Sequence, residues 1–291
     1  MDDLAALVAE ELALPVDPRV TAMAAAIAAQ HGAASRAVLF YGSCLREAEL
    51  DGLMLDFYLI VSDYDAAYGK SWLARANRLL PPNVFPFQQG GLAAKFAVLS
   101  EADFARMCSL EATDVSVWAR FAQPSRLVWA SDQLARQRAV QAVASAAPTL
   151  LGHTLPMLQE PDALAVWQTG FALTYRAELR AERGGRGASI VDSDPARYER
   201  FGVAARAHVQ LLMSPEATRR WWRRTQRRGK LLTLARLAKA SATFAGGIDY
   251  LAWKINRHAG TAIAIKPWQR RWPILGAISL LPRLVARGAV R

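Results

Sequence analysis

The sequence predicts an α+β fold, in which a mixed sheet with helices is followed by a mainly helical C-terminal half. Two observations support this prediction. Short apolar runs alternate with helical patterns up to about residue 135, whereas from about Ala139 nearly every segment has a helical pattern broken at Gly and Pro. Of the 291 residues, 53% are hydrophobic and 21% are charged, which is enough apolar material for a packed core.

The N-terminal half is predicted to contain an interrupted helical segment followed by four short strands. Residues 2–31 have helical spacing, interrupted at Pro15 and Pro18. Four short apolar runs then predict buried strands because they are too short for helices and are bounded by turn residues. The predicted strands are 37–41, 55–61, 94–100 and 126–130.

We expect three parts along the chain. Residues 1–135 are predicted to form a nucleotide-transfer-type domain, and residues 136–265 a helical domain that completes its site. Residues 266–291 predict an amphipathic tail that associates with a membrane. Its apolar face is formed by Ile274, Ile278, Leu281 and Val285. A separate cationic row is formed by Arg283, Arg287 and Arg291. A terminal helix packed on the protein's own core explains the same pattern equally well.

The charge balance indicates an anionic partner. The net charge is +11, which suits phosphate, nucleic acid or an acidic membrane surface. Cys44 and Cys108 have no metal-ligand spacing and no disulfide framework, which is typical of a reducing compartment. The acidic N-terminus differs from a signal peptide, and no apolar stretch reaches the ~20 residues of a spanning helix. We therefore expect a cytoplasmic protein, peripherally associated with the inner face of a membrane.

A Gly-Ser turn and a buried carboxylate form the strongest local motif, within residues 40–61. The first strand ends at Gly42-Ser43, where a helix is expected to begin at once. Backbone N–H groups and a hydroxyl at such a turn suit a triphosphate, and glycine permits close approach. Asp56 lies inside an apolar strand, where a carboxylate needs an ion pair or a metal ion. Polymerase-type nucleotidyltransferases combine such a turn with strand carboxylates that bind two divalent ions.

The acidic positions depart from the polymerase-type pattern, in which two acids flank one apolar residue. Met54 takes the first acidic position, and Asp51, just before the strand, is the nearest substitute. An ordinary Gly-Ser turn with an edge-strand Asp56 explains the same residues without catalysis. These residues alone leave both interpretations open.

Cations near this motif are candidates for binding phosphate. Lys95 lies within the apolar run 94–100, where it would hold triphosphate oxygens or the leaving pyrophosphate. The alternative is an edge position from which its amine reaches water. Arg46, just after the Gly-Ser turn, is a weaker triphosphate candidate. The four histidines are scattered without ligand spacing.

One face of a predicted helix in the C-terminal half supplies further carboxylates. The residues on this face are Phe171, Tyr175, Glu178 and Glu182. Glu178 would complete a metal site with Asp56, replacing the missing acidic position. An exposed helix with Glu–Arg pairs is the structural alternative, and it is the preferred interpretation for Glu182.

A dense basic block follows at 219–230. Arginines recur every four residues with Trp221 and Trp222 beside them. Such a face suits nucleic-acid phosphates, with stacking on tryptophan, or anionic lipid headgroups. A solvated helix is the plain alternative. The tail pattern, with Trp268 and Trp272 just ahead of it, favours lipid, and nucleic acid is the less favoured partner.

Several short motifs resemble one family in order and spacing. The family has a Tyr-Gly-Ser turn followed by a Met-Ile/Leu-Asp strand, and here these residues are Tyr41-Gly42-Ser43 and Met54-Leu55-Asp56. Met54, which departs from the polymerase-type pattern, therefore matches the family. The segments AKFAVLS (94–100), ARFAQPSRLVW (119–129) and LTYRAELR (173–180) follow, with Glu178 in place of the family's Asp. Over residues 38–180 the chain resembles the mitochondrial-type CDP-diacylglycerol synthases, the translocator assembly and maintenance family.

The resemblance implies a phosphatidate cytidylyltransferase, which uses CTP, phosphatidate and Mg²⁺ at a membrane surface. It implies three catalytic residues: Asp56, Lys95 and Glu178. The implied CTP-binding residues are Gly42, Ser43, Arg46, Lys95, Tyr175 and Arg180, and the implied metal ligands are Asp56, Asp51 and Glu178. Two alternatives stay open: a nucleotidyltransferase for RNA or a small soluble acceptor, and a non-catalytic membrane scaffold with a degenerate nucleotidyltransferase fold. The pattern predicts no oligomeric state.

Overall fold

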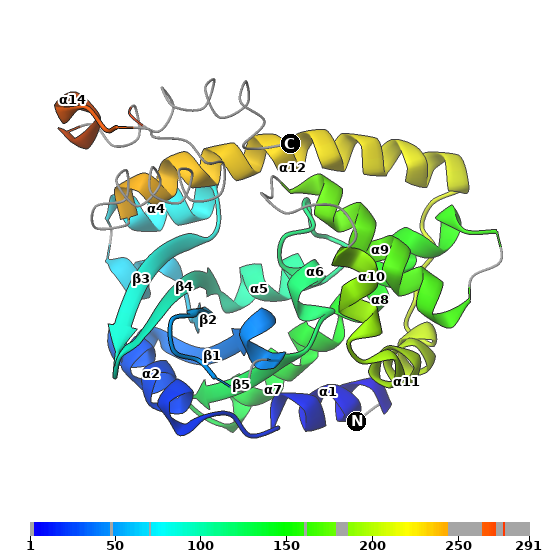
Figure 1. Ribbon diagram of the computed structural model, residues 1–291, viewed down its shortest axis with the longest axis horizontal. Helices are drawn as coiled ribbons and strands as arrows, with labels where there is room; N and C mark the ends of the chain where they lie inside the picture. Colours follow the sequence, from blue (N-terminus) through cyan, green and yellow to red (C-terminus); the bar gives the residue numbers. More distant parts are fainter. Residues whose placement is uncertain are drawn as a thin grey trace.

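A five-stranded mixed sheet forms the centre of the N-terminal half (Figure 1). The computed structural model describes residues 3–46, 49–69, 71–159, 162–178, 186–243, 264–271 and 276. The strands are β1 (Ser35–Tyr41), β2 (Met54–Val61), β3 (Asn83–Gln89), β4 (Leu92–Ser100) and β5 (Ser125–Ala130). Their order is β3-β4-β2-β1-β5, with β2 and β4 parallel and the other neighbours antiparallel.

All four predicted strands are confirmed, with ends shifted by at most two residues. The strand β3 was not predicted because Pro86 interrupts its apolar pattern. Proline lacks a backbone N–H and is tolerated at a sheet edge, which is where β3 lies. The edge strand pairs with β4 through an antiparallel register that runs from Asn83↔Val98 to Gln89↔Leu92.

One face of the sheet is covered by short helices from the first 80 residues. These helices are α2 (Pro18–Ala29), α3 (Tyr64–Tyr68) and α4 (Trp72–Leu79). The core on this side contains Ile27, Phe57 and Phe96. The predicted interruption before α2 is confirmed: Asp17 caps the helix by accepting the backbone N–H of Arg19, and Pro18 occupies its first turn.

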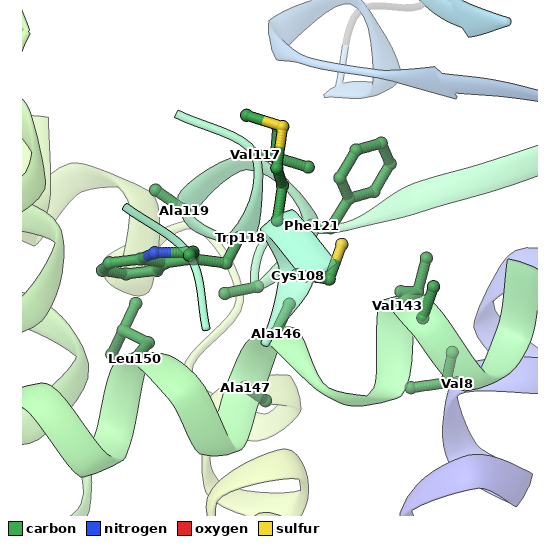
Figure 2. Packing of buried hydrophobic residues seen from close by; sticks show 14 of the residues in the cluster. Val8, Cys108, Val117, Trp118, Ala119, Phe121, Val143, Ala146, Ala147 and Leu150 are labelled. Atoms are coloured by element: carbon green, nitrogen blue, oxygen red, sulfur yellow. The ribbon is translucent and has the colours of Figure 1, made fainter. Parts of the chain in front are cut away.

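The other face carries a larger core. It is covered by α1 (Asp3–Leu12), α5 (Glu101–Cys108), α6 (Trp118–Phe121), α7 (Gln133–Ala144) and α8 (Ala146–Thr154). Figure 2 shows Val8 of α1, Cys108 of α5, Phe121 of α6 and Val143 of α7 gathered in this core. Both cysteines are free and buried. This face also carries the candidate site described below.

The C-terminal half is helical where it is described, so the predicted α+β class with a mainly helical second half is confirmed. Its helices are α9 (Ala163–Ala177), α10 (Arg186–Asp192), α11 (Pro195–Arg206), α12 (Pro215–Thr243) and α14 (Pro267–Arg271). The helix α12 is 29 residues long and contacts both α9 and β3 (Figure 1). Among the described residues, no helix is both long and apolar enough to cross a bilayer.

The larger core extends across the predicted domain boundary at residue 135. Leu39 of β1, Trp167 of α9 and Trp222 of α12 belong to the same cluster of buried residues. The division into domains therefore stays a prediction, since the described helices pack on the sheet unit through shared apolar contacts. Most of the predicted tail, 266–291, lies outside the described residues.

Candidate active site

Two predicted site residues, Asp56 and Lys95, form a row across the sheet with Tyr41 of the Tyr-Gly-Ser motif. In the strand registers, Tyr41 of β1 pairs with Asp56 of β2, and Asp56 pairs with Lys95 of β4. Side chains at paired positions lie on the same face of a sheet. That face is the one with the larger core, because Tyr58, two residues after Asp56, is buried there. We call this set the strand row.

The Gly-Ser turn is confirmed, and it abuts the strand row. Gly42 has a φ of +98°, a conformation that glycine adopts without strain. A Cβ atom at Gly42 would lie 3.4 Å from Oδ2 of Asp56, an ordinary van der Waals contact, so the positive φ and not a lack of space favours glycine here. The chain then forms a short 3₁₀ helix, Ser43–Arg46, in which Leu45 donates its N–H to the Gly42 carbonyl over 3.2 Å.

The carboxylate of Asp56 has an ionic partner in the strand row. The Nζ atom of Lys95 lies 3.1 Å from Oδ1 of Asp56, and their side chains are 33% and 24% exposed. Within the described residues Oδ1 has no hydrogen-bond partner, so this contact is an ion pair without hydrogen-bond geometry. A carboxylate inside an apolar strand is thus compensated by charge, while its oxygen retains capacity to bind a donor or a cation.

Glu178 ends the helix α9 and is paired with Arg120. Its Oε1 and Oε2 atoms accept from the guanidinium of Arg120 over 2.9 and 3.4 Å. Arg120 lies on α6 and also donates to the backbone carbonyl of Ser116, which orients it. The side chain of Glu178 is 12% exposed. Tyr175, one turn earlier on α9, packs against the larger core, and Arg180 lies outside the described residues.

Tyr41 links the two carboxylates. Its ring packs against Tyr58 and Phe121, with centroids 5.3 and 5.9 Å apart. Burial raises the pKa of Tyr41 well above its usual value, and the negative charges of Asp56 and Glu178 raise it further. The phenol is therefore within electrostatic range of both carboxylates. Asp56 and Glu178 therefore both lie near Tyr41, on the face of the sheet that carries the larger core.

Asp51 has a different environment from Asp56. It is 59% exposed, and its Oδ1 lies 3.2 Å from a guanidinium nitrogen of Arg19. Arg19 belongs to α2, which covers the opposite face of the sheet. The structure thus engages Asp51 with α2 and does not pair it with a residue of the strand row.

The site residues that the sequence reasoning missed hold α12 over the sheet unit. Arg236 of α12 donates to Asp114 over 2.8 Å and to the carbonyl of Pro81 over 2.7 Å. Lys239, one turn later, donates to the carbonyls of Leu80 and Pro82. A signal was present for Asp114 and Arg120, because both are charged residues within a predominantly apolar stretch, 112–122.

The carboxylates fit a Mg²⁺ ion that arrives with its substrate. Mg²⁺ is commonly bound through one or two carboxylates together with substrate phosphates and water, rather than by an all-protein cage. Asp56 is suited to this role because its Oδ1 atom is buried without a hydrogen bond among the described residues, while its Oδ2 atom faces the Gly42 turn. Among the described residues, no group of three acidic, histidine or cysteine side chains is positioned to hold a metal ion alone.

The basic block presents its arginines to solvent, while Trp222 is buried and Trp221 is partly buried. The exposed cations on α12 are Arg219, Arg220, Arg223, Arg224, Arg227, Arg228 and Lys230, which we call the arginine face. Trp222 is buried and Trp221 stacks on His153 with ring centroids 3.9 Å apart. The two tryptophans therefore anchor α12 to the protein instead of offering open stacking surfaces for nucleobases.

Comparison with known proteins identifies no family. No family model matches the sequence, and no curated protein matches it. The resemblance of the motifs to CDP-diacylglycerol synthases consequently stays a prediction, and the strand row and its neighbours are the observations from which function is inferred.

Proposed function

We propose that the protein is a metal-dependent phosphatidate cytidylyltransferase, which transfers CMP from CTP to phosphatidate and gives CDP-diacylglycerol and pyrophosphate. The observation that supports this proposal best is the strand row beside the Gly42 turn. It sets a carboxylate and an ammonium group 3.1 Å apart, next to a glycine whose φ of +98° other residues rarely adopt. A nucleoside triphosphate with its metal ion needs this combination of charges.

The proposed reaction is an in-line displacement at the α-phosphorus of CTP. A phosphate oxygen of phosphatidate forms the new P–O bond, and the bond to the bridging oxygen of the departing pyrophosphate breaks. Lys95 stabilises the negative charge of the triphosphate and of the leaving group. Gly42 and Ser43 offer backbone N–H groups and a hydroxyl to the phosphates. Because the attacking oxygen is already anionic, no general base is required.

Further residues complete the proposed CTP site. Arg46, Tyr175 and Arg180 are the other CTP-binding candidates that the family resemblance implies. Asp56 would hold Mg²⁺, with Glu178 as the second carboxylate. Asp51 stays a weaker candidate because its carboxylate is engaged by Arg19. When bound, the metal ion neutralises charge on the triphosphate and orients it.

The lipid part of the proposal is supported by charge. The arginine face carries seven exposed cations on one helix, and each cation near an anionic bilayer contributes about 1 kcal/mol of attraction. We assign the protein a peripheral position at the inner, cytoplasmic face of a membrane. Trp268, which lies within the predicted tail and before its apolar face, is 46% exposed and suits the interface of a bilayer.

An assay of lipid labelling tests the proposal. Purified protein is incubated with labelled CTP, Mg²⁺ and phosphatidate vesicles, and label in the lipid fraction is measured. We expect CDP-diacylglycerol from the wild type and about 10²- to 10³-fold less from Asp56→Asn. Asp65→Asn, an exposed acid on α3, serves as the matched control and retains activity. A folded wild type that gives no lipid-linked CMP would refute the assignment.

The arginine face also favours a second candidate, nucleotidyl transfer to RNA or to a small soluble acceptor. The tryptophans reduce its support, because base stacking would need exposed rings, whereas Trp222 is buried and Trp221 is partly buried and stacked on His153. Vesicle flotation and an RNA gel shift at the same physiological salt concentration separate the two. Preferential RNA retention with CTP-dependent labelling of RNA would replace phosphatidate as the acceptor. A folded protein without metal-dependent CTP binding would instead indicate the non-catalytic scaffold.

A further inference from the structure

Both carboxylates of the proposed metal site are already paired with a cation. Asp56 faces Lys95, and Glu178 faces Arg120 through two contacts of 2.9 and 3.4 Å. These pairs come together from four separate elements, β2, β4, α6 and α9. A partly buried ion pair is weak evidence for stability, because desolvation offsets much of the attraction. Tyr41 is near both pairs, because it is the sheet partner of Asp56 and its ring packs against Phe121, the neighbour of Arg120. Two such pairs near one tyrosine therefore call for a functional explanation.

We propose that the two ion pairs exchange partners when a metal-bound triphosphate enters. Lys95 and Arg120 transfer to the phosphate oxygens, and Asp56 and Glu178 turn to the metal ion. Arg120 is thereby a substrate-binding residue, and Glu178 is the group that holds it ready in the nucleotide-free protein. This inference rests on the nucleotide class of the proposed function and does not depend on the lipid acceptor.

The charges and shapes of the four groups suit this exchange. The two carboxylates and two cations balance one another before binding, so neither set is left unpaired in a partly buried place. Mg²⁺ and a triphosphate offer the same groups a matched set of opposite charges. The planar guanidinium of Arg120 can bind phosphate oxygens through two parallel N–H donors. Its bond to the Ser116 carbonyl keeps it oriented while Glu178 is exchanged.

The packing of α12 explains why Glu178 reaches Arg120. Gly229 lies inside the 29-residue helix α12, where glycine is unfavourable by about 1 kcal/mol relative to alanine. A Cβ atom at this position would overlap the carbonyl oxygen of Ala177, the residue before Glu178. The missing side chain lets α12 lie directly against the last turn of α9. Gly229 is thus a positioning residue for Glu178.

Calorimetry with CTP, in the presence and absence of Mg²⁺, tests the exchange without any lipid. Arg120→Gln removes a phosphate ligand, so we expect CTP to bind about 10- to 100-fold more weakly under both conditions. Glu178→Gln releases Arg120 from its carboxylate, so we expect Mg²⁺-free CTP to bind several-fold more tightly than to the wild type. The same variant loses most of the gain in affinity that Mg²⁺ confers on the wild type.

Two further proteins serve as controls. Glu101→Gln/Arg138→Gln removes another ion pair, between α5 and α7, and it should leave the binding of CTP and Mg²⁺ as in the wild type. Arg120→Gln/Glu178→Gln removes both charges of the pair, so neither a lone cation nor a lone carboxylate is left in the partly buried position. This double variant should fold, bind CTP weakly and respond little to Mg²⁺.

The outcomes separate this inference from the proposed function. Equal weakening of Mg²⁺-free CTP binding by Arg120→Gln and Glu178→Gln would overturn the exchange, because a purely structural pair behaves in that way. CTP binding with the expected opposite signs but no lipid product would support the exchange and overturn the phosphatidate assignment. A folded wild type that binds neither CTP nor pyrophosphate would overturn both.

Discussion

The indole N–H of Trp222 donates to the backbone carbonyl oxygen of His153 over 2.8 Å and ties α12 to the end of α8. The imidazole of the same histidine stacks on Trp221 and lies 6.0 Å from the ring of Trp118. Neither ring nitrogen of His153 has a hydrogen-bond partner within the described structure. The position of α12, and with it the arginine face and Gly229, depends on this aromatic contact.

We predict that His153 makes the fold sensitive to acid. Burial lowers the pKa of His153 to about 4, below its usual value of 6.5. The unfolded chain therefore binds the proton first, and stability that is present above pH 6.5 is lost as the pH falls towards 4. The expected loss is about 3 kcal/mol in the free energy of unfolding. Denaturant unfolding at pH 7 and 4.5 should show a smaller difference for His153→Phe. Identical pH dependence in both proteins would contradict the prediction.

Gly229→Ala should destabilise the protein although alanine favours helix. The added Cβ overlaps the Ala177 carbonyl oxygen, and backbone on both sides limits relief. We expect a net loss of about 1 to 3 kcal/mol, the usual cost of overpacking. Thermal unfolding measures it, with Lys230→Ala at the next, exposed position as the control. An unchanged or higher melting temperature for Gly229→Ala would show that α12 does not press on α9.

Lys95→Gln should affect CTP binding far more than stability. The Lys95–Asp56 pair is about one-quarter to one-third exposed, so water partly replaces the lost ammonium group at Asp56, and the free energy of unfolding should fall by only about 1 to 2 kcal/mol. Loss of the charge that faces the triphosphate should lower kcat/KM for CTP by about 10²-fold. Lys230→Gln removes a charge elsewhere and controls for net charge. A large stability change with unchanged kcat/KM would assign Lys95 a structural role.

The arginine face should govern attachment to anionic vesicles. Replacing Arg220, Arg223 and Arg227 with Gln should weaken binding by about 10²-fold at low salt, at about 1 kcal/mol per cation. Higher salt should reduce the difference, since screening weakens the attraction of the wild type. The control replaces Arg75, Arg136 and Arg200, exposed arginines on other helices. Vesicle co-sedimentation measures both proteins, and equal losses would indicate that net charge alone determines binding.

The sequence predicted the buried strands and the turn because their signals are local. Short apolar runs revealed four strands, and Gly42-Ser43 marked the turn by residue type. The edge strand β3 was not predicted because Pro86 and the polar residues near it interrupt the alternation of apolar and polar residues that indicates a strand. Lys95 and Asp56 were each identified, but their contact depends on β2 and β4 being parallel neighbours, which local pattern does not determine. The Glu178–Arg120 pair joins residues 58 positions apart and could be found only in the folded chain.

The parallel pairing of β2 with β4 has a consequence for synthesis of the chain on the ribosome. Asp56 emerges well before Lys95, and both strands must be available before their carboxylate and ammonium groups meet. Arg120 follows, then Glu178, and finally Gly229, which sets the helix carrying Glu178 in place. The parts of the site thus become available from the N-terminus towards the C-terminus. A chain released early, after β5 but before the end of α9, would lack Glu178, so it would expose Arg120 without its carboxylate and would be a substrate for chaperones or proteases.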